Sequence, residues 1–545
     1  MMGVQPPFGR SHGRSMVISQ YGIAATSHPF ASQAGAQILA RGGSAADAAI
    51  AANAVLGVVE PMMNGIGGDL FVLYWDAKTG TLSGLNASGP APRSLSPEVL
   101  ASQGLTAMPD SGIHSVTVPG AVDGWAKVHE RFGKLPWKDL FRFAIAYARD
   151  GFPVTEIVQE LWSAPASVAK LRASPETARV FLPQGQPPQL GEVFRNPDLA
   201  RAYQMLADVG STSFYQGDIA AAIIATATSL GGWMDAGDLA SFSAEWVEPI
   251  SIDYRGWRVS ELPPNGQGMA ALEMLNLMET LPADPEGPFS AGEIHKRIEA
   301  MKLAYADVYR YNGDPRSSGI PVAGLLSKPY ARERAALINP QRANPDAGPG
   351  RPPGSDTIYL TVVDRDGNIA SWIQSIYSGF GSGITVNGLG FELQNRGAGF
   401  TLEPGHPNVL TGGKRPFHTI IPGFMERGNV RMGFGIMGGA NQPLAHAQFV
   451  SNVVDYGMNL QQAMEAPRFF KGSSTGCDVS IESRVPARTL RELSDMGHLV
   501  MERAEYSQEM GRGQAILHNS DTGTNYAASD PRSDGAATPE PAPFV

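Results

Sequence analysis

Hydrophobic positions near the start of the chain predict two consecutive helices and a buried strand. Ala31 to Val59 has a helical pattern that is interrupted at Gly42-Gly43. Ser44 is a favourable N-cap, and Asp47 three residues later gives an acidic form of the capping box. The second helix is rich in alanine and apolar on almost every side, so we expect it to be buried. After a glycine-rich turn, Leu70 to Trp75 is typical of a buried strand.

The same alternation of helical and strand patterns continues through the chain. Helices are expected at Ala121 to Arg131, Trp137 to Asp150 and Ala291 to Tyr311, and a strand at Ile252 to Leu262. The proline-rich tail, Thr538 to Val545, is expected to be disordered. Strands with flanking helices favour a layered α/β protein, and such a fold can hold 545 residues as one unit.

One break in the pattern precedes a strongly strand-forming segment. Asn339 to Ser355 contains five prolines and three glycines, which prevent both helix and regular strand. By itself this segment is typical of a surface linker. Thr357 to Asp364 then follows at once as a β-branched, apolar strand. Asp366-Gly367-Asn368 is a hairpin turn, and Ile369 to Ile376 is the second strand. A flexible arm therefore runs directly into a buried hairpin.

A threonine at the first position of a core strand, directly after a flexible arm, has the placement that self-cleavage requires. The Thr357 hydroxyl can attack the preceding carbonyl, and hydrolysis of the resulting ester releases the arm. The freed α-amine, whose pKa is lower than that of lysine, can then act as a general base for the same hydroxyl. Composition alone would leave Thr357 an ordinary strand residue.

Composition narrows the class of protein. Apolar residues at 43% and charged residues at 17% are typical of a globular chain, and the net charge of −10 argues against nucleic-acid binding. The single cysteine, Cys477, excludes an intramolecular disulfide and a thiolate metal cluster. The chain shows no transmembrane run and no signal-peptide h-region, so we expect a soluble, cytoplasmic protein that binds no membrane.

Several segments, taken in order, resemble the γ-glutamyltranspeptidase family of N-terminal-nucleophile hydrolases. They are Ala31-Ser32-Gln33-Ala34-Gly35 through Gly65-Ile66-Gly67-Gly68, Thr117-Val118-Pro119-Gly120, Gly133-Lys134-Leu135-Pro136-Trp137, Phe214-Tyr215-Gln216-Gly217, Glu299-Ala300-Met301-Lys302-Leu303-Ala304, Gly313-Asp314-Pro315, Val362-Val363-Asp364-Arg365-Asp366-Gly367-Asn368, Lys414-Arg415-Pro416, Gly438-Gly439, Asp455-Tyr456-Gly457, Ala466-Pro467-Arg468 and Asp530-Pro531-Arg532-Ser533-Asp534-Gly535.

This resemblance implies a four-layer αββα sandwich that is self-cleaved into two subunits. The large subunit would be residues 1–356, with the pre-cleavage arm at 339–356, and the small catalytic subunit residues 357–545. The two would form a heterodimer from one precursor, with a higher oligomer left open. The resemblance implies no cofactor and no metal, and the substrate would be a small-molecule amide.

Matched residue by residue, the resemblance also implies a catalytic set. The nucleophile falls on Thr357, and the cleavage site lies between Asp356 and Thr357. The second hydroxyl of the family falls on Ser375, where it can orient the nucleophile. The backbone amides of Gly438-Gly439 match the oxyanion hole, because adjacent glycines let the backbone approach a developing negative charge closely.

The positions that hold the γ-glutamyl group in the family are different here. The family's arginine falls at about Ser88 and its asparagine on Tyr377. Its glutamine and aspartate fall on Arg396 and Gly399, its serine pair on His418-Thr419, and its cut-site histidine on Tyr359.

The aspartate that would pair with the substrate ammonium is therefore missing, and an unpaired buried ammonium costs several kcal/mol. Arg396 and His418 could instead bind a carboxylate. This pattern is similar to the acylase and amidohydrolase branch of the family, which acts on amides of dicarboxylic acids without the glutamyl amine. A true γ-glutamyltransferase or glutathione hydrolase stays the alternative.

Two readings from other classes stay open. Gly433 to Gly438 spells G-x-G-x-x-G, and Asp455 follows at a distance that suits a ribose carboxylate. Pro443 and the lack of a βαβ unit weigh against this dinucleotide-binding oxidoreductase. A non-catalytic homologue would show as an uncut chain. Histidines such as His28, His114 and His446 show no metal-ligand spacing.

Overall fold

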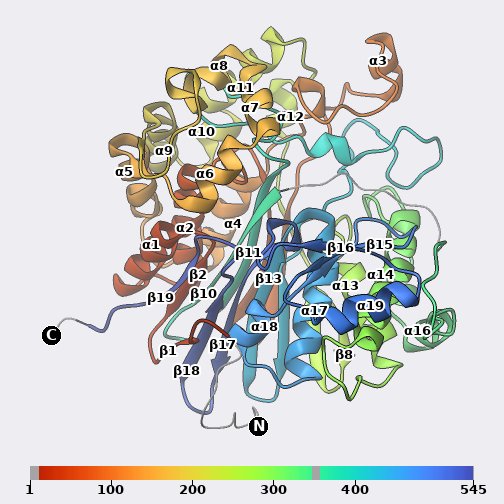
Figure 1. Ribbon diagram of the computed structural model, residues 1–545. Coiled ribbons are helices and arrows are strands. Elements are labelled where there is room, and N and C mark those ends of the chain that lie inside the picture. Colours follow the sequence, from red (N-terminus) through yellow and green to blue (C-terminus); the bar gives the residue numbers. More distant parts are fainter. Residues whose placement is uncertain (1–11, 347–355, 544–545) are drawn as a thin grey trace.

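Two β-sheets pack face to face in the middle of the molecule, and helices cover the outer face of each (Figure 1). The computed structural model describes residues 12–346 and 356–543. This arrangement is the αββα sandwich expected from the sequence. No helix in these ranges combines the length and apolar character needed to cross a bilayer.

The first sheet contains the hairpin that begins at the expected cleavage site. Its order is β19 (Ala536–Pro539), β2 (Ile23–Thr26), β10 (Asp356–Val363), β11 (Ile369–Tyr377), β3 (Asp69–Asp76), β4 (Thr81–Ala87) and β7 (Glu245–Val247). Every pairing in it is antiparallel. Strands β10 and β11 therefore lie at the centre, as their β-branched, apolar sequence predicts.

The second sheet is also antiparallel and packs against the inner face of the first. Its order is β1 (Val17–Ser19), β18 (Thr524–Ser529), β17 (Arg512–Asn519), β13 (Val430–Met437), β12 (Gly423–Arg427), β9 (Trp257–Glu261) and β8 (Ile250–Tyr254). Two small sheets lie apart: β14 (Phe469–Phe470) with β15 (Asp478–Glu482) and β16 (Leu499–Arg503), and β5 (Phe152–Pro153) with β6 (Val193–Phe194).

Helices from the first half of the chain cover the first sheet and share one core with it. They are α1 (Pro29–Ala40), α2 (Ala45–Val59), α4 (Ala121–Phe132), α5 (Arg142–Asp150), α6 (Glu156–Ser163), α7 (Pro165–Arg172), α8 (Pro175–Phe181), α9 (Pro197–Val209), α10 (Thr212–Tyr215), α11 (Asp218–Ser229) and α12 (Ala236–Ala240). The short helix α3 (Pro97–Ser102) contributes Leu100 to a separate small cluster.

A second core lies between the second sheet and the helices on its outer side. These helices are α13 (Gly268–Glu279), α14 (Ala291–Tyr311), α15 (Val322–Leu325), α16 (Lys328–Ala335), α17 (Gln442–Val454), α18 (Leu460–Glu465) and α19 (Ala487–Asp495). In Figure 1 they appear in green and blue, opposite the red, orange and yellow helices of the first half.

Local sequence signals explain the helix that supports the hairpin. The Ser44 side chain accepts from the Asp47 amide at 3.2 Å, and the Asp47 carboxylate accepts from the Ser44 amide at 2.9 Å, so the expected capping box is present. Every residue of α2 is buried. The helix packs on β10 and β11, because its small alanine side chains allow a close approach.

Two expectations were wrong. The segment from Ile252 to Leu262 is not one strand, since β8 and β9 form a hairpin that turns at Arg255 and Gly256, both with positive φ. The tail does not lose its order at Thr538, because β19 continues to Pro539 along β2 and Glu540 accepts from the Gly22 amide at 3.0 Å. In the first case, the turn between β8 and β9 has no strong signal in the sequence. In the second, the tail is ordered by pairing with β2, which lies far away in the sequence.

The expected arm lies partly outside the described residues. Its first part, up to Asp346, is held by polar contacts described below, and residues 347–355 are not described.

Candidate active site

Thr357 is fully buried and is the second residue of β10. Its Oγ1 donates to the Oγ of Ser375 on β11 at 3.2 Å. Asp356 pairs with Tyr377 and Ile358 with Gln374, so two residues of β11, Ser375 and Ile376, lie opposite Thr357 and form a β-bulge in β11. Bulges re-aim side chains near the end of a ladder, so this one affects how Ser375 faces Thr357.

The hydroxyl of Ser375 is itself held in place. It accepts from the amide of Tyr377 at 2.7 Å, in addition to the bond from Thr357. Tyr377 has a φ of 83°, a left-handed conformation that is unusual for a side chain with a Cβ. Strained residues of this kind concentrate at functional sites, because only surrounding contacts can hold them.

Contacts across the sandwich show which part of the second sheet faces Thr357. A Cβ at Gly433 would lie 2.8 Å from Thr361 Oγ1, and a Cβ at Gly435 would lie 2.4 Å from the ring of Tyr359. Side chains alternate along a strand, so Thr357 shares the inward face with Tyr359 and Thr361. Continuing the same spacing places Thr357 opposite the end of β13, where Gly438-Gly439 begins.

The Gly438-Gly439 turn has a conformation that glycine favours. Its φ values are 142° and 59°. Gln267 Nε2 donates to the Gly439 carbonyl at 2.8 Å and to the Thr419 carbonyl at 2.6 Å, which ties the turn to the neighbouring segment. Fixed backbone amides beside a nucleophile can stabilise an oxyanion without reorganisation. Their role as the oxyanion hole stays a prediction.

Arg396 is a buried cation with unused donors. Its guanidinium stacks over the ring of Tyr377 at 4.1 Å and donates through Nη1 to Thr419 Oγ1 at 2.9 Å. Nε and Nη2 are buried and have no hydrogen-bond partner among residues 12–346 and 356–543. Burial lowers the pKa of Arg396 to about 10, against the pull of Tyr377 and Asp69. Such a group is stabilised by an anion that accepts from both free nitrogens.

His418 and Asp69 form a buried pair on the same side of the site. His418 Nε2 lies 3.0 Å from Asp69 Oδ2, and His418 Nδ1 accepts from the Ile420 amide at 3.3 Å. The proton of a neutral imidazole is therefore on Nε2 and points at Asp69. Burial, with Arg396 and Arg415 nearby, holds the pKa of His418 well below its usual value, so the ring is neutral.

The carboxylate of Asp69 is occupied by protein donors. Besides His418, its Oδ1 accepts from the amides of Gly89 at 3.1 Å and Gly120 at 3.3 Å and from Gln394 Nε2 at 2.9 Å. Burial raises the pKa of Asp69 to about 7, and Arg396 opposes that rise. The sequence did not single out Asp69. The feature that could have identified it is its position: Asp69 is an acidic residue at the start of an apolar strand, directly after two glycines.

Ser88 is connected to His418 through Asn265. Its hydroxyl donates to Asn86 Oδ1 at 2.7 Å, and its carbonyl accepts from Arg415 Nε at 2.9 Å. Asn265 links the segments, since its Oδ1 accepts from Asn86 at 2.9 Å and its carbonyl accepts from the His418 amide at 2.9 Å. The structure thus brings Thr357, Ser375, Tyr377, Arg396, His418 and Thr419 together and leaves Ser88 as a support.

The glycine motif from Gly433 to Gly438 does not form a nucleotide-binding loop. Gly433 and Gly435 lie inside the antiparallel strand β13, where Thr361 and Tyr359 fill the space next to them. A dinucleotide site needs a parallel strand followed by the glycine turn. Asp455 is engaged elsewhere, by the Tyr254 hydroxyl at 2.6 Å and by Arg255 at 3.0 Å.

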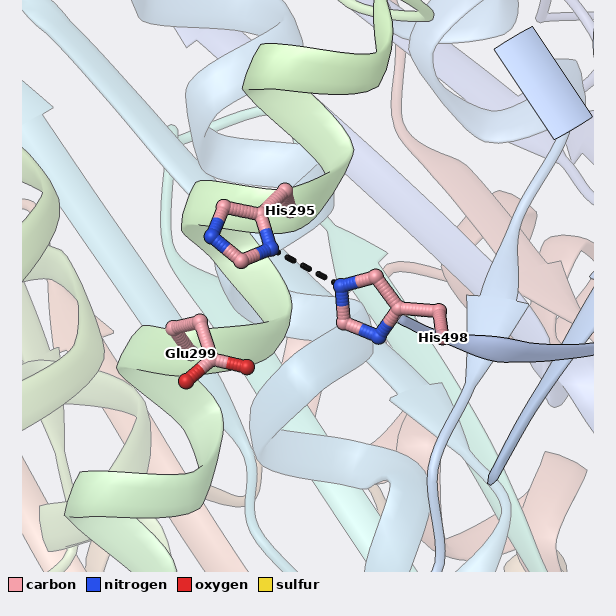
Figure 2. A group of neighbouring side chains, drawn as sticks. All are labelled: His295, Glu299 and His498. Atoms are coloured by element: carbon pink, nitrogen blue, oxygen red, sulfur yellow. Dashed lines mark hydrogen bonds between the residues drawn. The ribbon is translucent and has the colours of Figure 1, made fainter. Parts of the chain in front are cut away.

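One buried group has the residue types of a metal site: His295 and Glu299 on α14 with His498 (Figure 2). His295 Nδ1 lies 2.8 Å from His498 Nε2, and His295 Nε2 bonds the Asn339 carbonyl at 2.7 Å. Lys302 Nζ donates to Glu299 Oε1 at 2.6 Å and to the Asn344 carbonyl at 2.8 Å. A buried ammonium on the carboxylate disfavours a cation there, so we interpret the cluster as an anchor for the start of the arm.

Comparisons with known proteins find relatives over almost the whole chain. A sequence model of the gamma-glutamyltranspeptidase family matches residues 31–540. The chain is 37% identical to the glutathione hydrolase-like YwrD proenzyme of Bacillus subtilis, over 96% of this chain and 99% of the relative. It is 35% identical to the oxamate amidohydrolase proenzyme of Klebsiella pneumoniae, over 95% and 98%. The crystal structure of a cephalosporin acylase from Bacillus halodurans superposes with a TM-score of 0.91 and 41% identity, over 99% of both chains.

Proposed function

Since this chain belongs to the gamma-glutamyltranspeptidase family, we propose that it is a self-processing amidohydrolase whose nucleophile is Thr357. The observation that carries the proposal is the position of Thr357. It is the second residue of a central strand, its hydroxyl contacts Ser375, and the register across the sandwich brings it opposite the end of β13, next to Gly438-Gly439.

Processing follows from this geometry in two steps. The Thr357 oxygen attacks the carbonyl carbon of Asp356, the C–N bond breaks, and an ester forms while the nitrogen becomes an α-amine. Water then hydrolyses the ester and leaves a carboxylate on residue 356 and a free N-terminal threonine. The products are a large subunit of residues 1–356 and a small subunit of residues 357–545.

Turnover reuses the same oxygen. The α-amine accepts the proton of the Thr357 hydroxyl while Oγ1 attacks the substrate amide, and the oxyanion develops next to Gly438-Gly439. The amine then returns the proton to the leaving nitrogen, and an acyl ester stays on Thr357. Attack by water completes hydrolysis, and attack by an acceptor amine would give acyl transfer.

Mass spectrometry of freshly folded protein tests the assignment. We expect a new N-terminus at Thr357 without added protease. Thr357→Ala should give one intact, inactive chain, whereas Thr357→Ser should cleave slowly because its hydroxyl survives. A cut at any other bond, or an uncut wild-type chain as in a non-catalytic homologue, would contradict the proposal.

For the substrate, we propose an amide whose acyl group ends in a bare carboxylate, as in the monoamide of a dicarboxylic acid. Arg396 supports this, because its free Nε and Nη2 match the two oxygens of a carboxylate. Gly399 offers no charge to an ammonium, and Asp69 already accepts four hydrogen bonds. An ammonium close to Arg396 would be repelled, by on the order of 1–4 kcal/mol.

The kcat/KM for a glutaryl anilide against the matching γ-glutamyl anilide tests this choice, because the two differ only in the amine. We expect the glutaryl compound to be hydrolysed at least about tenfold better. Arg396→Ala should remove most of that advantage. A tenfold preference for the γ-glutamyl compound would instead identify a glutathione-degrading transpeptidase, with Asp69 or another acid serving the ammonium.

A further inference from the structure

A second buried arginine with unused donors lies at the start of β17. Only 3% of Arg512 is exposed. Its Nη2 lies 3.1 Å from Met63 Sδ, while Nε and Nη1 have no hydrogen-bond partner among the described residues. Water screens such a charge poorly, so its field reaches further than that of a surface arginine.

Strand pairing places Arg512 in the same layer of the sandwich as Thr357. Arg512 pairs directly with Met437, so both side chains lie on the inward face. The register between β10 and β13 places Thr357 opposite Met437. The other end of the arginine is also tied to the site, because the Met63 carbonyl accepts from the amide of Ile376, next to Ser375, at 3.2 Å.

The charged groups around this layer leave Arg512 without a matching carboxylate at acid pH. Glu60, at the end of α2, is the acid that interacts with Arg512, and it accepts from the Ser27 hydroxyl. Burial raises the pKa of Glu60 to about 7; Arg512 opposes this rise and Asp534 adds to it. Below that pH Glu60 is neutral.

The groups on the other side of Thr357 supply no free negative charge that would offset the charge of Arg512. There Asp69 lies beside the cation Arg396 and is occupied by protein donors, and His418 is neutral. The two tyrosines nearby are uncharged as well, since burial raises the pKa of Tyr377 to about 12 and that of Tyr359 still higher.

We propose that Arg512 keeps the α-amine of Thr357 unprotonated in the processed enzyme, so that the amine can accept the hydroxyl proton at neutral pH. This inference rests on the proposed function, since the amine exists only after cleavage at Thr357. Arg512 acts through its charge and touches no reacting atom. A free α-amine ordinarily titrates near roughly pH 8. A like charge about 10 Å away, at an effective dielectric near 20, weakens proton binding by roughly tenfold.

The experiment is the pH dependence of kcat/KM for processed wild type, Arg512→Gln, Arg512→Lys and Glu60→Gln. Arg512→Gln should move the acidic limb of the kcat/KM profile, where activity rises with pH, up by about one pH unit. At pH values below this limb kcat/KM should be roughly tenfold lower than in wild type, and the difference should shrink as pH rises. Arg512→Lys keeps the cation and should keep the wild-type limb. Glu60→Gln removes an opposing charge only above about pH 7, where Glu60 is ionised, so it should leave the acidic part of the profile below that pH unchanged.

Arg431 supplies a control, because it lies at the far end of β13 and pairs with Glu426 at 2.9 Å. Arg431→Gln should leave the limb in place. Mass spectrometry and thermal unfolding are recorded for each variant. If Arg512→Gln does not fold, Arg512→Met, which also removes the charge and keeps an unbranched side chain next to Met63, is measured in its place and should show the same shift. A fully processed Arg512→Gln with a wild-type limb, or a Lys variant as impaired as Gln, overturns the inference. An uncut wild-type chain would overturn the assignment of Thr357 instead.

Discussion

Ser375 is the side chain that we propose orients Thr357, since the two hydroxyls share a hydrogen bond. Its oxygen accepts from the Thr357 hydroxyl and from the Tyr377 amide, so one atom connects the nucleophile to the strained residue beneath Arg396. The reactive hydroxyl and the proposed carboxylate site are therefore coupled through two residues of one strand. A change at Ser375 should affect chemistry more than folding, because the hydroxyl contributes little volume to the core.

Ser375→Ala should slow processing and turnover by about ten- to thirtyfold, the loss expected from one hydrogen bond to a nucleophile. Ser375→Thr restores a hydroxyl and should recover most of the rate. Ser371→Ala is the matched control, since Ser371 lies on the same face of β11 and bonds Tyr359 at 2.7 Å instead. Rates are followed by gel analysis of cleavage and by anilide hydrolysis. Wild-type rates in Ser375→Ala would contradict the orienting role.

Strands β10 and β13 approach closely because glycines stand where the larger side chains point. Tyr359 fills the space beside Gly435, and Thr361 fills the space beside Gly433. This contact sets the height of Thr357 relative to the Gly438-Gly439 turn. The glycines of the false nucleotide motif therefore serve the packing of two sheets.

Gly435→Ala should push β10 away from β13, because the added Cβ would lie 2.4 Å from the Tyr359 ring. Overpacking of this kind lowers the free energy of unfolding by about 1–3 kcal/mol. Displacement of Thr357 should also slow processing. Gly319→Ala serves as the control, since nothing lies within 4 Å of its added Cβ. Chemical denaturation and cleavage kinetics give the two readouts. Unchanged stability in Gly435→Ala would show that the sheets tolerate a wider gap.

The two proposed subunits share both sheets. In the first sheet, β10 and β11 of the small subunit lie between β2 and β3 of the large one, and β19 adds to the outer edge of β2. In the second, the small subunit supplies β12, β13, β17 and β18, flanked by β1 and β9. Cleavage before Thr357 would thus break one peptide bond and leave the ladders from Ile358 onward hydrogen-bonded.

The processed fragments should therefore stay together as a heterodimer. Size-exclusion chromatography in native buffer should show both fragments in one peak, and only denaturant should separate them, because separation exposes the strands on both sides of β10 and β11. Intact Thr357→Ala protein provides the reference elution volume. Fragments that separate without denaturant would contradict the shared sheets.

Local patterns in the sequence determined the elements that surround Thr357. Apolar periodicity and the Ser44–Asp47 capping box define α1 and α2, and β-branched residues around Asp366-Gly367-Asn368 define the β10–β11 hairpin. These signals involve residues close in the chain, so they survive without knowledge of the fold. Family motifs then pointed to Thr357, Ser375 and Arg396 as one site.

Only the tertiary structure decided what these residues contact. Asp69 reaches His418 and Gln394 across more than half of the chain, and Arg512 enters the layer of Thr357 through its pairing with Met437. The same reason explains β19, which orders the tail because β2 offers a free edge. Pairing between distant strands and the burial of charge depend on neighbours that local periodicity does not encode, so the chemistry of the candidate site became visible only when the sheets were assembled.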